Sequence, residues 1–265
     1  MRRILAAVTA AAALATLAMT SPAQAAVSSG EYVALGDSYA SGVGAEPYLQ
    51  ASGDCRQSPN SYPRQWAKVW PKFVLDDQTC SGATVQDVRT KQLGGLDNGT
   101  KLVTITVGGN DVGFAKSATT CLTGTDDECL RAAFFSVLAI REDLPSRLRD
   151  LFADVRRRAP NAHVAFLGYP RLVDPGTGSC GVITPGAKKR EYMNYAADQA
   201  AEIMKQATEK AGYEFIDVRL AFAEHGACSA SPFINNVDPN RYTEIFHPTK
   251  EGYTAYAWWL GLSMM

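Results

Sequence analysis

The fold is indicated first by one stretch of sequence, KLVTITVGGND at residues 101–111. Its first seven residues are largely apolar and β-branched, which favours a strand that is buried on both faces. Gly108 and Gly109 end the run, and Asn110 and Asp111 follow directly. Strands of this kind belong to parallel sheets that helices cover on both sides, and ligands of such sheets bind beyond the carboxyl ends of the strands. Asn110 and Asp111 are therefore candidate site residues.

Shorter runs of the same kind lie on both sides of this stretch and alternate with helical patterns. The predicted strands cover residues 32–35, 72–75, 101–107, 162–167 and 214–218. The predicted helices cover residues 60–70 and 145–158, a long segment capped at Thr184-Pro185 and ended by Gly212, and residues 249–262. Strands and helices that alternate without a Pro- or Ser-rich linker predict one three-layer α/β/α domain with a parallel sheet.

The composition excludes several classes of protein. Of the 265 residues, 46% are hydrophobic, which is typical of a folded chain rather than a disordered one. The formal net charge is −1, so the charge balance gives no reason to expect nucleic acid as a partner. The chain has no repeat of fixed period, which excludes collagen and solenoid architectures.

The first 25 residues have the three parts of a secretory signal peptide. Met1-Arg2-Arg3 supplies positive charge, the run from Ile4 to Met19 is apolar and uncharged, and small residues precede a cleavage site after Ala25. A membrane anchor is the alternative, but the apolar run is shorter than the ~20 residues of a span, and Pro22 stands where a spanning helix would continue. We therefore expect export, by the Sec or the twin-arginine route, and a soluble extracellular domain over residues 26–265 with no stable membrane anchor.

Six cysteines remain in that domain, namely Cys55, Cys80, Cys121, Cys129, Cys180 and Cys228. An even number in an exported chain indicates disulfides, and the residues alone leave about fifteen pairings open. None of the cysteines forms a C-x-x-C pair, and the chain has only three histidines. We therefore expect no metal site and no cofactor.

Four segments with polar or glycine residues follow predicted strands or precede a predicted helix. They are GDSYASG at 36–42, CSGAT at 80–84, GGND at 108–111 and FHP at 246–248. A serine hydroxyl becomes a nucleophile when a base removes its proton, and histidine is the base whose pKa suits neutral pH. The tetrahedral intermediate of acyl transfer needs donors such as backbone N–H groups or an asparagine amide. These segments therefore predict acyl transfer, with the site residues Ser38 (nucleophile), His247 (base), and Gly82 and Asn110 (oxyanion donors).

The four segments resemble, in order, the four sequence blocks of the SGNH, or GDSL, hydrolase family, and they span nearly the whole expected domain. This resemblance implies a flavodoxin-like sheet of about five parallel strands, with Ser38 as nucleophile and His247 as base. It also implies an oxyanion hole formed by the N–H groups of Ser38 and Gly82 and by Asn110. The cysteines resemble those of the secreted actinobacterial (Streptomyces-type) lipases and esterases of the family, which implies the pairs Cys55–Cys80, Cys121–Cys129 and Cys180–Cys228.

One position departs from the family pattern. The last block usually reads D-x-x-H, whereas Glu244 stands three residues before His247. Glu244 could orient the imidazole as the third member of a triad. Alternatively, a backbone carbonyl just before His247 orients it and leaves a Ser–His dyad, because the longer glutamate side chain need not reach Nδ1. Both interpretations stay open at this point.

The sequence thus predicts a secreted serine esterase or lipase that hydrolyses a small-molecule or lipid carboxylic ester and is a monomer. A phospholipase A-type enzyme, a carbohydrate acetyl esterase and a catalytically silent binding protein on the same scaffold are the alternatives. The choice of acyl chain and alcohol depends on loops expected at residues 43–58, 114–129 and 173–182. Trp258 and Trp259 are expected in the core, and activity is expected to rise with pH as His247 loses its proton near ~6.5.

Overall fold

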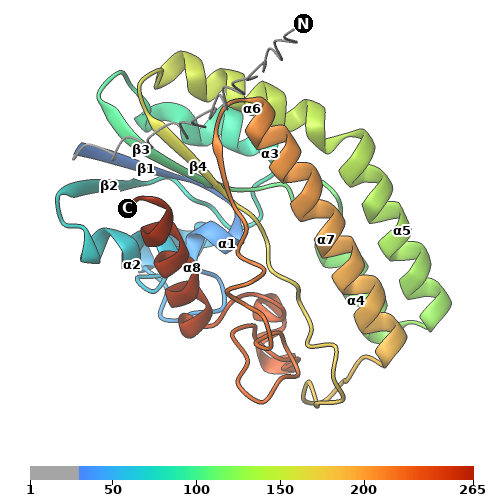
Figure 1. Ribbon diagram of the computed structural model, residues 1–265. Helices are drawn as coiled ribbons and strands as arrows, with labels where there is room; N and C mark the ends of the chain where they lie inside the picture. Colours follow the sequence, from blue (N-terminus) through green and yellow to red (C-terminus); the bar gives the residue numbers. More distant parts are fainter. Residues whose placement is uncertain (1–29) are drawn as a thin grey trace, which may run out of the picture.

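The structure, a computed structural model, describes residues 30–265, so the expected signal peptide lies outside the described residues. Five parallel strands form one sheet in the order β2-β1-β3-β4-β5 (Figure 1). They are β1 (Gly30–Gly36), β2 (Phe73–Asp77), β3 (Thr100–Thr106), β4 (His163–Leu167) and β5 (Glu214–Ile216). This strand order is that of flavodoxin-like folds, and it confirms the predicted parallel sheet.

Helices cover both faces of this sheet (Figure 1). One face carries α2 (Tyr62–Val69) and α8 (Lys250–Ser263), and the other carries α3 (Val85–Asp87), α6 (Leu144–Arg158) and α7 (Ala187–Lys210). Two further helices, α4 (Phe114–Thr123) and α5 (Asp126–Glu142), pack on each other and on α7. The remaining elements are short: α1 (Ser38–Ser41), η1 (Gln50–Cys55), η2 (Val88–Gln92), η3 (Leu93–Gly95) and η4 (Pro239–Glu244).

The central strands contribute to two apolar cores, because successive residues of a strand point to opposite faces of the sheet. In β1, Tyr32 and Ala34 pack on the side of α2 and α8. Val33 and Leu35 pack on the side of α6 and α7. We call these two clusters the α2/α8 core and the α6/α7 core. All four side chains are fully buried, and burial of one large apolar side chain contributes roughly 1.5–3 kcal/mol to stability.

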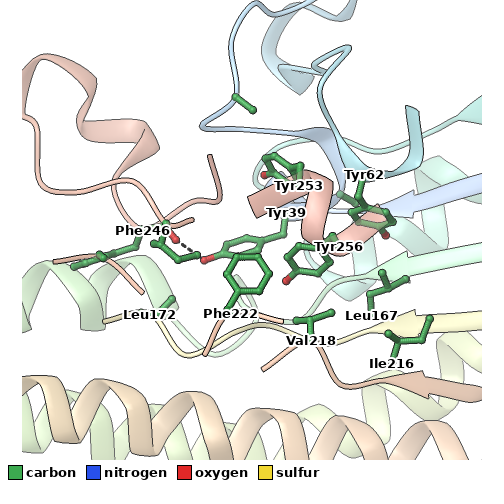
Figure 2. Packing of buried hydrophobic residues seen from close by; sticks show 14 of the residues in the cluster. Tyr39, Tyr62, Leu167, Leu172, Ile216, Val218, Phe222, Phe246, Tyr253 and Tyr256 are labelled. Atoms are coloured by element: carbon green, nitrogen blue, oxygen red, sulfur yellow. Dashed lines mark hydrogen bonds between the residues drawn. The ribbon is translucent and has the colours of Figure 1, made fainter. Parts of the chain in front are cut away.

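The α2/α8 core extends beyond the carboxyl ends of the strands into the loops that follow them (Figure 2). There, Tyr253 and Tyr256 of α8 lie near Tyr39, and Tyr39 points at Phe246 from the segment before α8. The Tyr253 hydroxyl also donates a hydrogen bond to the carbonyl of Ser38 at 3.2 Å. Packing in this core therefore brings together two segments that are about two hundred residues apart in the chain.

The prediction of a loop over residues 114–129 is wrong, because this segment forms α4 and the beginning of α5. Helix α5 begins with a capping box. The Thr125 side chain accepts a hydrogen bond from the N–H of Glu128, and the Glu128 carboxylate accepts one from the N–H of Thr125. Acidic residues in the first turn also interact favourably with the helix dipole. The sequence TDDE at 125–128 carries this start signal, so the helix follows from local residues.

Two further expectations differ from the structure. Helix α7 begins at Ala187 rather than at Thr184-Pro185, because the Thr184 hydroxyl accepts a hydrogen bond from the N–H of Cys180 and does not cap the helix. Trp258 is 65% exposed, so it does not belong to the core, whereas Trp259 packs against the α2/α8 core.

Three disulfides link segments that are separated in the chain, and their pairs are those that the family resemblance implies: Cys55–Cys80, Cys121–Cys129 and Cys180–Cys228. The first joins η1 to the loop after β2, the second joins α4 to α5, and the third joins the loop after β4 to the segment after β5. In the part of the chain that the structure describes, no helix has both the length and the apolar character of a membrane span.

We expect the disulfide that closes the longer loop to contribute more to stability, because closing a longer loop restricts the unfolded chain more. Replacing Cys180 and Cys228 by alanine opens a loop with a sequence separation of 48 and should lower the Tm by roughly 8–16 °C. Replacing Cys121 and Cys129 opens one with a separation of 8 and should lower the Tm by roughly 5–10 °C. Scanning calorimetry of both double variants checks this order, and a reversed order would contradict the loop argument.

Candidate active site

The four segments singled out in the sequence meet at the carboxyl edge of the sheet. Strands β1 and β3 are neighbours, so the segments that follow them lie side by side. One pocket at this edge is lined by Ser38, Gly82, Asn110 and His247 together. Glu244 is not among the described residues that line it. The structure thus brings together the predicted nucleophile, base and oxyanion donors, and it leaves Glu244 outside the pocket.

Ser38 is presented by a sharp turn at the end of β1. Gly36 has a φ of +135°, and a Cβ on it would lie 2.2 Å from the carbonyl oxygen of Thr106 on β3, so only glycine fits. Asp37 then caps helix α1 by accepting a hydrogen bond from a backbone N–H of its first turn. Ser38 is the first residue of this helix, and its hydroxyl oxygen lies 2.8 Å from Nε2 of His247. This distance is that of a hydrogen bond.

His247 is the last residue of a type II turn over residues 244–247. The N–H of His247 donates to the carbonyl of Glu244 at 3.0 Å. Ile245 and Phe246 occupy the two central positions of the turn, with φ of −53° and +63°. The second central position of such a turn normally holds glycine, because a residue with a side chain is strained at positive φ. The histidine therefore follows a strained residue.

Contacts from distant parts of the chain hold Phe246 in this conformation. The Tyr39 hydroxyl donates to its carbonyl (Figure 2), and the N–H of Phe246 donates to the carbonyl of Asn235 at 3.1 Å. The Phe246 side chain is buried in the α2/α8 core. The Asn235 amide also donates to the carbonyl of His247 at 3.0 Å, so the backbone is anchored on both sides of the strained residue.

The imidazole of His247 is neutral at neutral pH. Burial of the ring lowers the pKa of His247 to about 4, and the backbone carbonyl of Ile245 and the charge of Glu244 act in the opposite direction. This value is below the ~6.5 that the sequence leads one to expect, because the sequence does not reveal the burial. Among the described residues, Nδ1 makes no hydrogen bond of standard geometry. A neutral ring next to a serine hydroxyl can accept its proton.

The Glu244 carboxylate has other partners than the histidine ring. One oxygen accepts hydrogen bonds from the Tyr48 hydroxyl at 2.5 Å and from the Arg56 guanidinium at 2.8 Å. The other oxygen forms an ion pair with Arg241. The side chain is only 4% exposed, so these contacts balance a buried charge. Glu244 thus stabilises the turn that presents His247, and it makes no hydrogen bond to the ring within the described residues.

Hydrogen-bond donors without partners lie on the same pocket. Gly82 has a φ of +80°, and a Cβ on it would meet nothing within 4 Å, so the backbone conformation and not the space favours glycine here. Nδ2 of Asn110 donates to the carbonyl of Ala83 at 2.9 Å, which leaves its second N–H for another acceptor. No hydrogen bond among the described residues uses the backbone N–H of Ser38 or of Gly82. Three donors are therefore available to an oxygen bound in this pocket.

Asp111 connects two of the site segments and is not directed at the pocket. One of its carboxylate oxygens accepts a hydrogen bond from the N–H of Val85 at 2.9 Å, and the other accepts one from Arg147 at 3.1 Å. Its side chain is almost completely buried. The loop that follows β3 is thereby fixed to the loop that carries Gly82.

Asp37 is a second buried ionisable group, directly before Ser38 in the chain. Its carboxylate accepts a hydrogen bond from the Tyr169 hydroxyl at 2.5 Å, and the same hydroxyl oxygen accepts one from the N–H of Gly109 at 3.1 Å. Burial raises the pKa of Asp37 to about 7, although the hydrogen bonds from the Tyr169 hydroxyl and from the N–H of Tyr39 act to lower it. Asp37 therefore connects the loops that follow β1, β3 and β4.

Several residues that hold the site together are not predicted from the sequence. Gln92 of η2 binds both peptide groups of Gly36: Oε1 accepts from the N–H at 2.7 Å, and Nε2 donates to the carbonyl at 2.9 Å. Asn235 and Tyr39 hold the turn before His247, and neither has a local sequence signature. Tyr169 could have been found, because it lies two residues after a predicted strand, where site residues of this fold gather.

Known proteins resemble this chain in both sequence and structure. A model of the GDSL-like lipase/acylhydrolase family matches residues 34–255. The chain is 40% identical over 241 residues to Lipase 1 of Streptomyces coelicolor, with 91% of this chain and 88% of that protein covered.

Two solved structures match it with a TM-score of 0.84 each. The phospholipase A1 of Streptomyces albidoflavus NA297 is 37% identical, with 89% of this chain and 99% of that one covered. The extracellular lipase of Streptomyces rimosus is 38% identical, with 88% and 98% covered. The family model covers most of the chain, and the relatives are about 40% identical to it. Both findings confirm the resemblance of the four segments to the GDSL hydrolase family. The chain therefore belongs to the GDSL-like lipase/acylhydrolase family, and it is a carboxylic ester hydrolase.

Proposed function

We propose that the protein is a secreted serine esterase or lipase that cleaves its substrate through an acyl-enzyme on Ser38. The observation that carries this proposal is the distance of 2.8 Å between the Ser38 hydroxyl oxygen and Nε2 of His247. A neutral imidazole at this distance is suited to remove the serine proton. The free donors of the same pocket are suited to stabilise the negative charge that then develops.

The proposed reaction has two halves. Nε2 of His247 takes the proton of the Ser38 hydroxyl while Oγ bonds to the carbonyl carbon of the ester. The carbonyl oxygen becomes an oxyanion, which the N–H groups of Ser38 and Gly82 and the amide of Asn110 stabilise. The protonated His247 then gives its proton to the alcohol oxygen, which leaves. In the second half, His247 takes a proton from water while the water oxygen attacks the acyl-enzyme carbonyl carbon. The protonated His247 then gives this proton to Oγ of Ser38 as the bond between Oγ and the acyl carbon breaks, which releases the carboxylic acid and restores Ser38.

In this proposal Ser38 and His247 act as a dyad. The charged imidazole forms only transiently, and the backbone carbonyl of Ile245 favours that form. The occupation of the Glu244 carboxylate by one tyrosine and two arginines supports this assignment. Glu244 is then a positioning residue that acts through the turn before the histidine.

A lipid ester is the substrate class that we favour. The catalytic pocket has several apolar side chains in its wall, among them Phe114, Leu122, Tyr242 and Ile245. The similarity to a protein named phospholipase A1 also supports a lipid ester. A triglyceride, a phospholipid and an acetylated xylan, offered separately, distinguish the lipid esters from a carbohydrate ester, and hydrolysis of the xylan alone would exclude our choice.

We also propose that residues 1–25 are removed during export and that the mature protein, one domain over residues 26–265, acts outside the cell. Three observations support this proposal: the pattern of residues 1–25, the three disulfides, and the similarity to a lipase that is named extracellular. The intact mass of the protein recovered from culture medium identifies the site of cleavage directly.

We expect a fluorophosphonate to label that mature protein once and to abolish its hydrolysis of p-nitrophenyl butyrate, because the activated Ser38 attacks phosphorus as it attacks a carbonyl carbon. Intact-mass spectrometry measures the adduct. Ser38→Ala should gain no mass and should lose activity by several orders of magnitude. Ser41→Ala is the matched control, since Ser41 lies on the same short helix but is fully buried, and it should be labelled as the wild type is. Labelling of Ser38→Ala would contradict the assignment.

We expect Glu244→Gln to lower kcat no more than several-fold, because its carboxylate makes no hydrogen bond to the ring of His247 in the described structure. Loss of a triad carboxylate lowers kcat by about 10⁴. The substitution should also lower the Tm, since it removes the negative charge between two arginines. Steady-state kinetics and scanning calorimetry on the same preparation separate the two effects. A loss of kcat near 10⁴ in a folded variant would make Glu244 a member of a triad.

We expect kcat/KM for p-nitrophenyl butyrate to fall on the acid side only as the pH approaches about 4, because protonated His247 cannot accept the serine proton. Activity measured after a return to neutral pH separates this effect from acid unfolding. Asp37→Asn is the control, because Asp37 titrates near pH 7 and could add its own step. A fall centred near ~6.5 that remains in Asp37→Asn would mean that burial does not shift the histidine.

A further inference from the structure

A second cavity lies beside the catalytic pocket, among α4, α5, α7 and the loop that follows β4. Its volume is about 60 Å³. Of the described side chains that line it, none is charged, and the polar ones are two serines and two tyrosines. The hydroxyls of both tyrosines already donate hydrogen bonds within the protein. A cavity with so few free polar groups holds no ordered water network and accepts apolar groups.

The cavity exists because three helices face one another with small side chains. They contribute Ala118 from α4, Ala133 and Ser136 from α5, and Ala196 and Ala197 from α7. Ala133 and Ala197 are buried, yet they belong to neither the α2/α8 core nor the α6/α7 core. Side chains of both cores line the cavity, and the small alanines between them leave this space unfilled.

The cavity and the catalytic pocket share a wall. Five residues line both, namely Tyr39, Gly109, Phe114, Ala118 and Tyr169. Tyr169 is fixed, because its hydroxyl bonds to Asp37 and to the N–H of Gly109. Phe114 is the first residue of α4, is only partly buried, and has no polar group on its side chain. Movement of the Phe114 ring in this shared wall would break no hydrogen bond of its side chain.

We propose that this cavity binds the end of the substrate's acyl chain and that the protein therefore prefers medium-chain acyl esters to acetyl esters. The inference rests on the proposed function of Ser38. The wall shared with the pocket that contains Ser38 and the apolar lining both favour a hydrocarbon chain as the occupant. A volume of about 60 Å³ holds about four groups the size of a water molecule. The cavity thus takes the last few carbons of a chain whose first carbons lie in the catalytic pocket.

The first test fills the cavity. Ala197→Leu places an isobutyl group where a methyl group lines the space, and Ala187→Leu makes the same change at the exposed first residue of α7. The kcat/KM for p-nitrophenyl decanoate is divided by that for p-nitrophenyl acetate in each protein. Each methylene that loses its buried site costs roughly a factor of four. We expect this ratio to fall at least ~10-fold in Ala197→Leu and to keep the wild-type value in Ala187→Leu.

A variant with a smaller added side chain tests the proposal even if Ala197→Leu does not fold. Ala133→Val enters the same cavity from α5 and should lower the ratio in the same direction by a smaller factor. The Tm of each variant shows that it folds. An unchanged ratio in both folded filling variants, or equal losses on decanoate and acetate, would overturn the proposal.

A binding measurement separates this proposal from the proposed function. Titration calorimetry of Ser38→Ala with decanoic acid should detect binding, and adding Ala197→Leu to the same protein should weaken it at least ~10-fold. If the wild type hydrolyses no ester but this binding pattern holds, the proposed function fails and the cavity assignment stands. If the wild type is active and Ala197→Leu leaves the binding of decanoic acid unchanged, the cavity assignment fails and the proposed function stands.

Discussion

The position of His247 beside Ser38 depends on one strained turn. Phe246 has a φ of +63°, a conformation that costs a residue with a side chain of order 1–3 kcal/mol. Burial of the phenylalanine side chain contributes roughly 1.5–3 kcal/mol and offsets this cost, and hydrogen bonds from Tyr39 and to Asn235 direct the backbone. Because the next residue is His247, the core that holds Phe246 also fixes the ring beside Ser38. The packing of the core and the geometry of Ser38 and His247 are therefore set by the same contacts.

Burial also determines the charges at the site. It lowers the pKa of His247 and raises the pKa of Asp37, so in both cases it favours the neutral form. The Glu244 carboxylate lies close to His247, and its oxygens contact two arginines and a tyrosine rather than the ring. The ring of His247 thus lies beside an apolar core, and the nearby Glu244 carboxylate is directed to other partners. That environment suits an ester with a hydrocarbon chain, since the cavity behind Phe114 belongs to the same apolar surroundings.

Much of the fold and of the site could be predicted from the sequence, because strand and motif signals are local. The five strands and the residues Ser38, Gly82, Asn110 and His247 follow from apolar runs and the polar residues after them. The helices over 114–129 were missed although the capping signal is present, since a polar composition alone resembles a loop. Gln92 could not be found, because a buried glutamine is recognised only by the distant peptide group that it binds.

The sequence by itself determined the five strands, the chemical groups available at the carboxyl edge and the resemblance to the family. It could do so because periodicity and short motifs reside in neighbouring residues. Only the tertiary structure decided the partners of Glu244, the low pKa of His247 and the existence of the cavity between α4, α5 and α7. Each of these depends on which side chains from distant segments fill a given space, and neither burial nor a gap in packing is encoded in any one stretch of the chain.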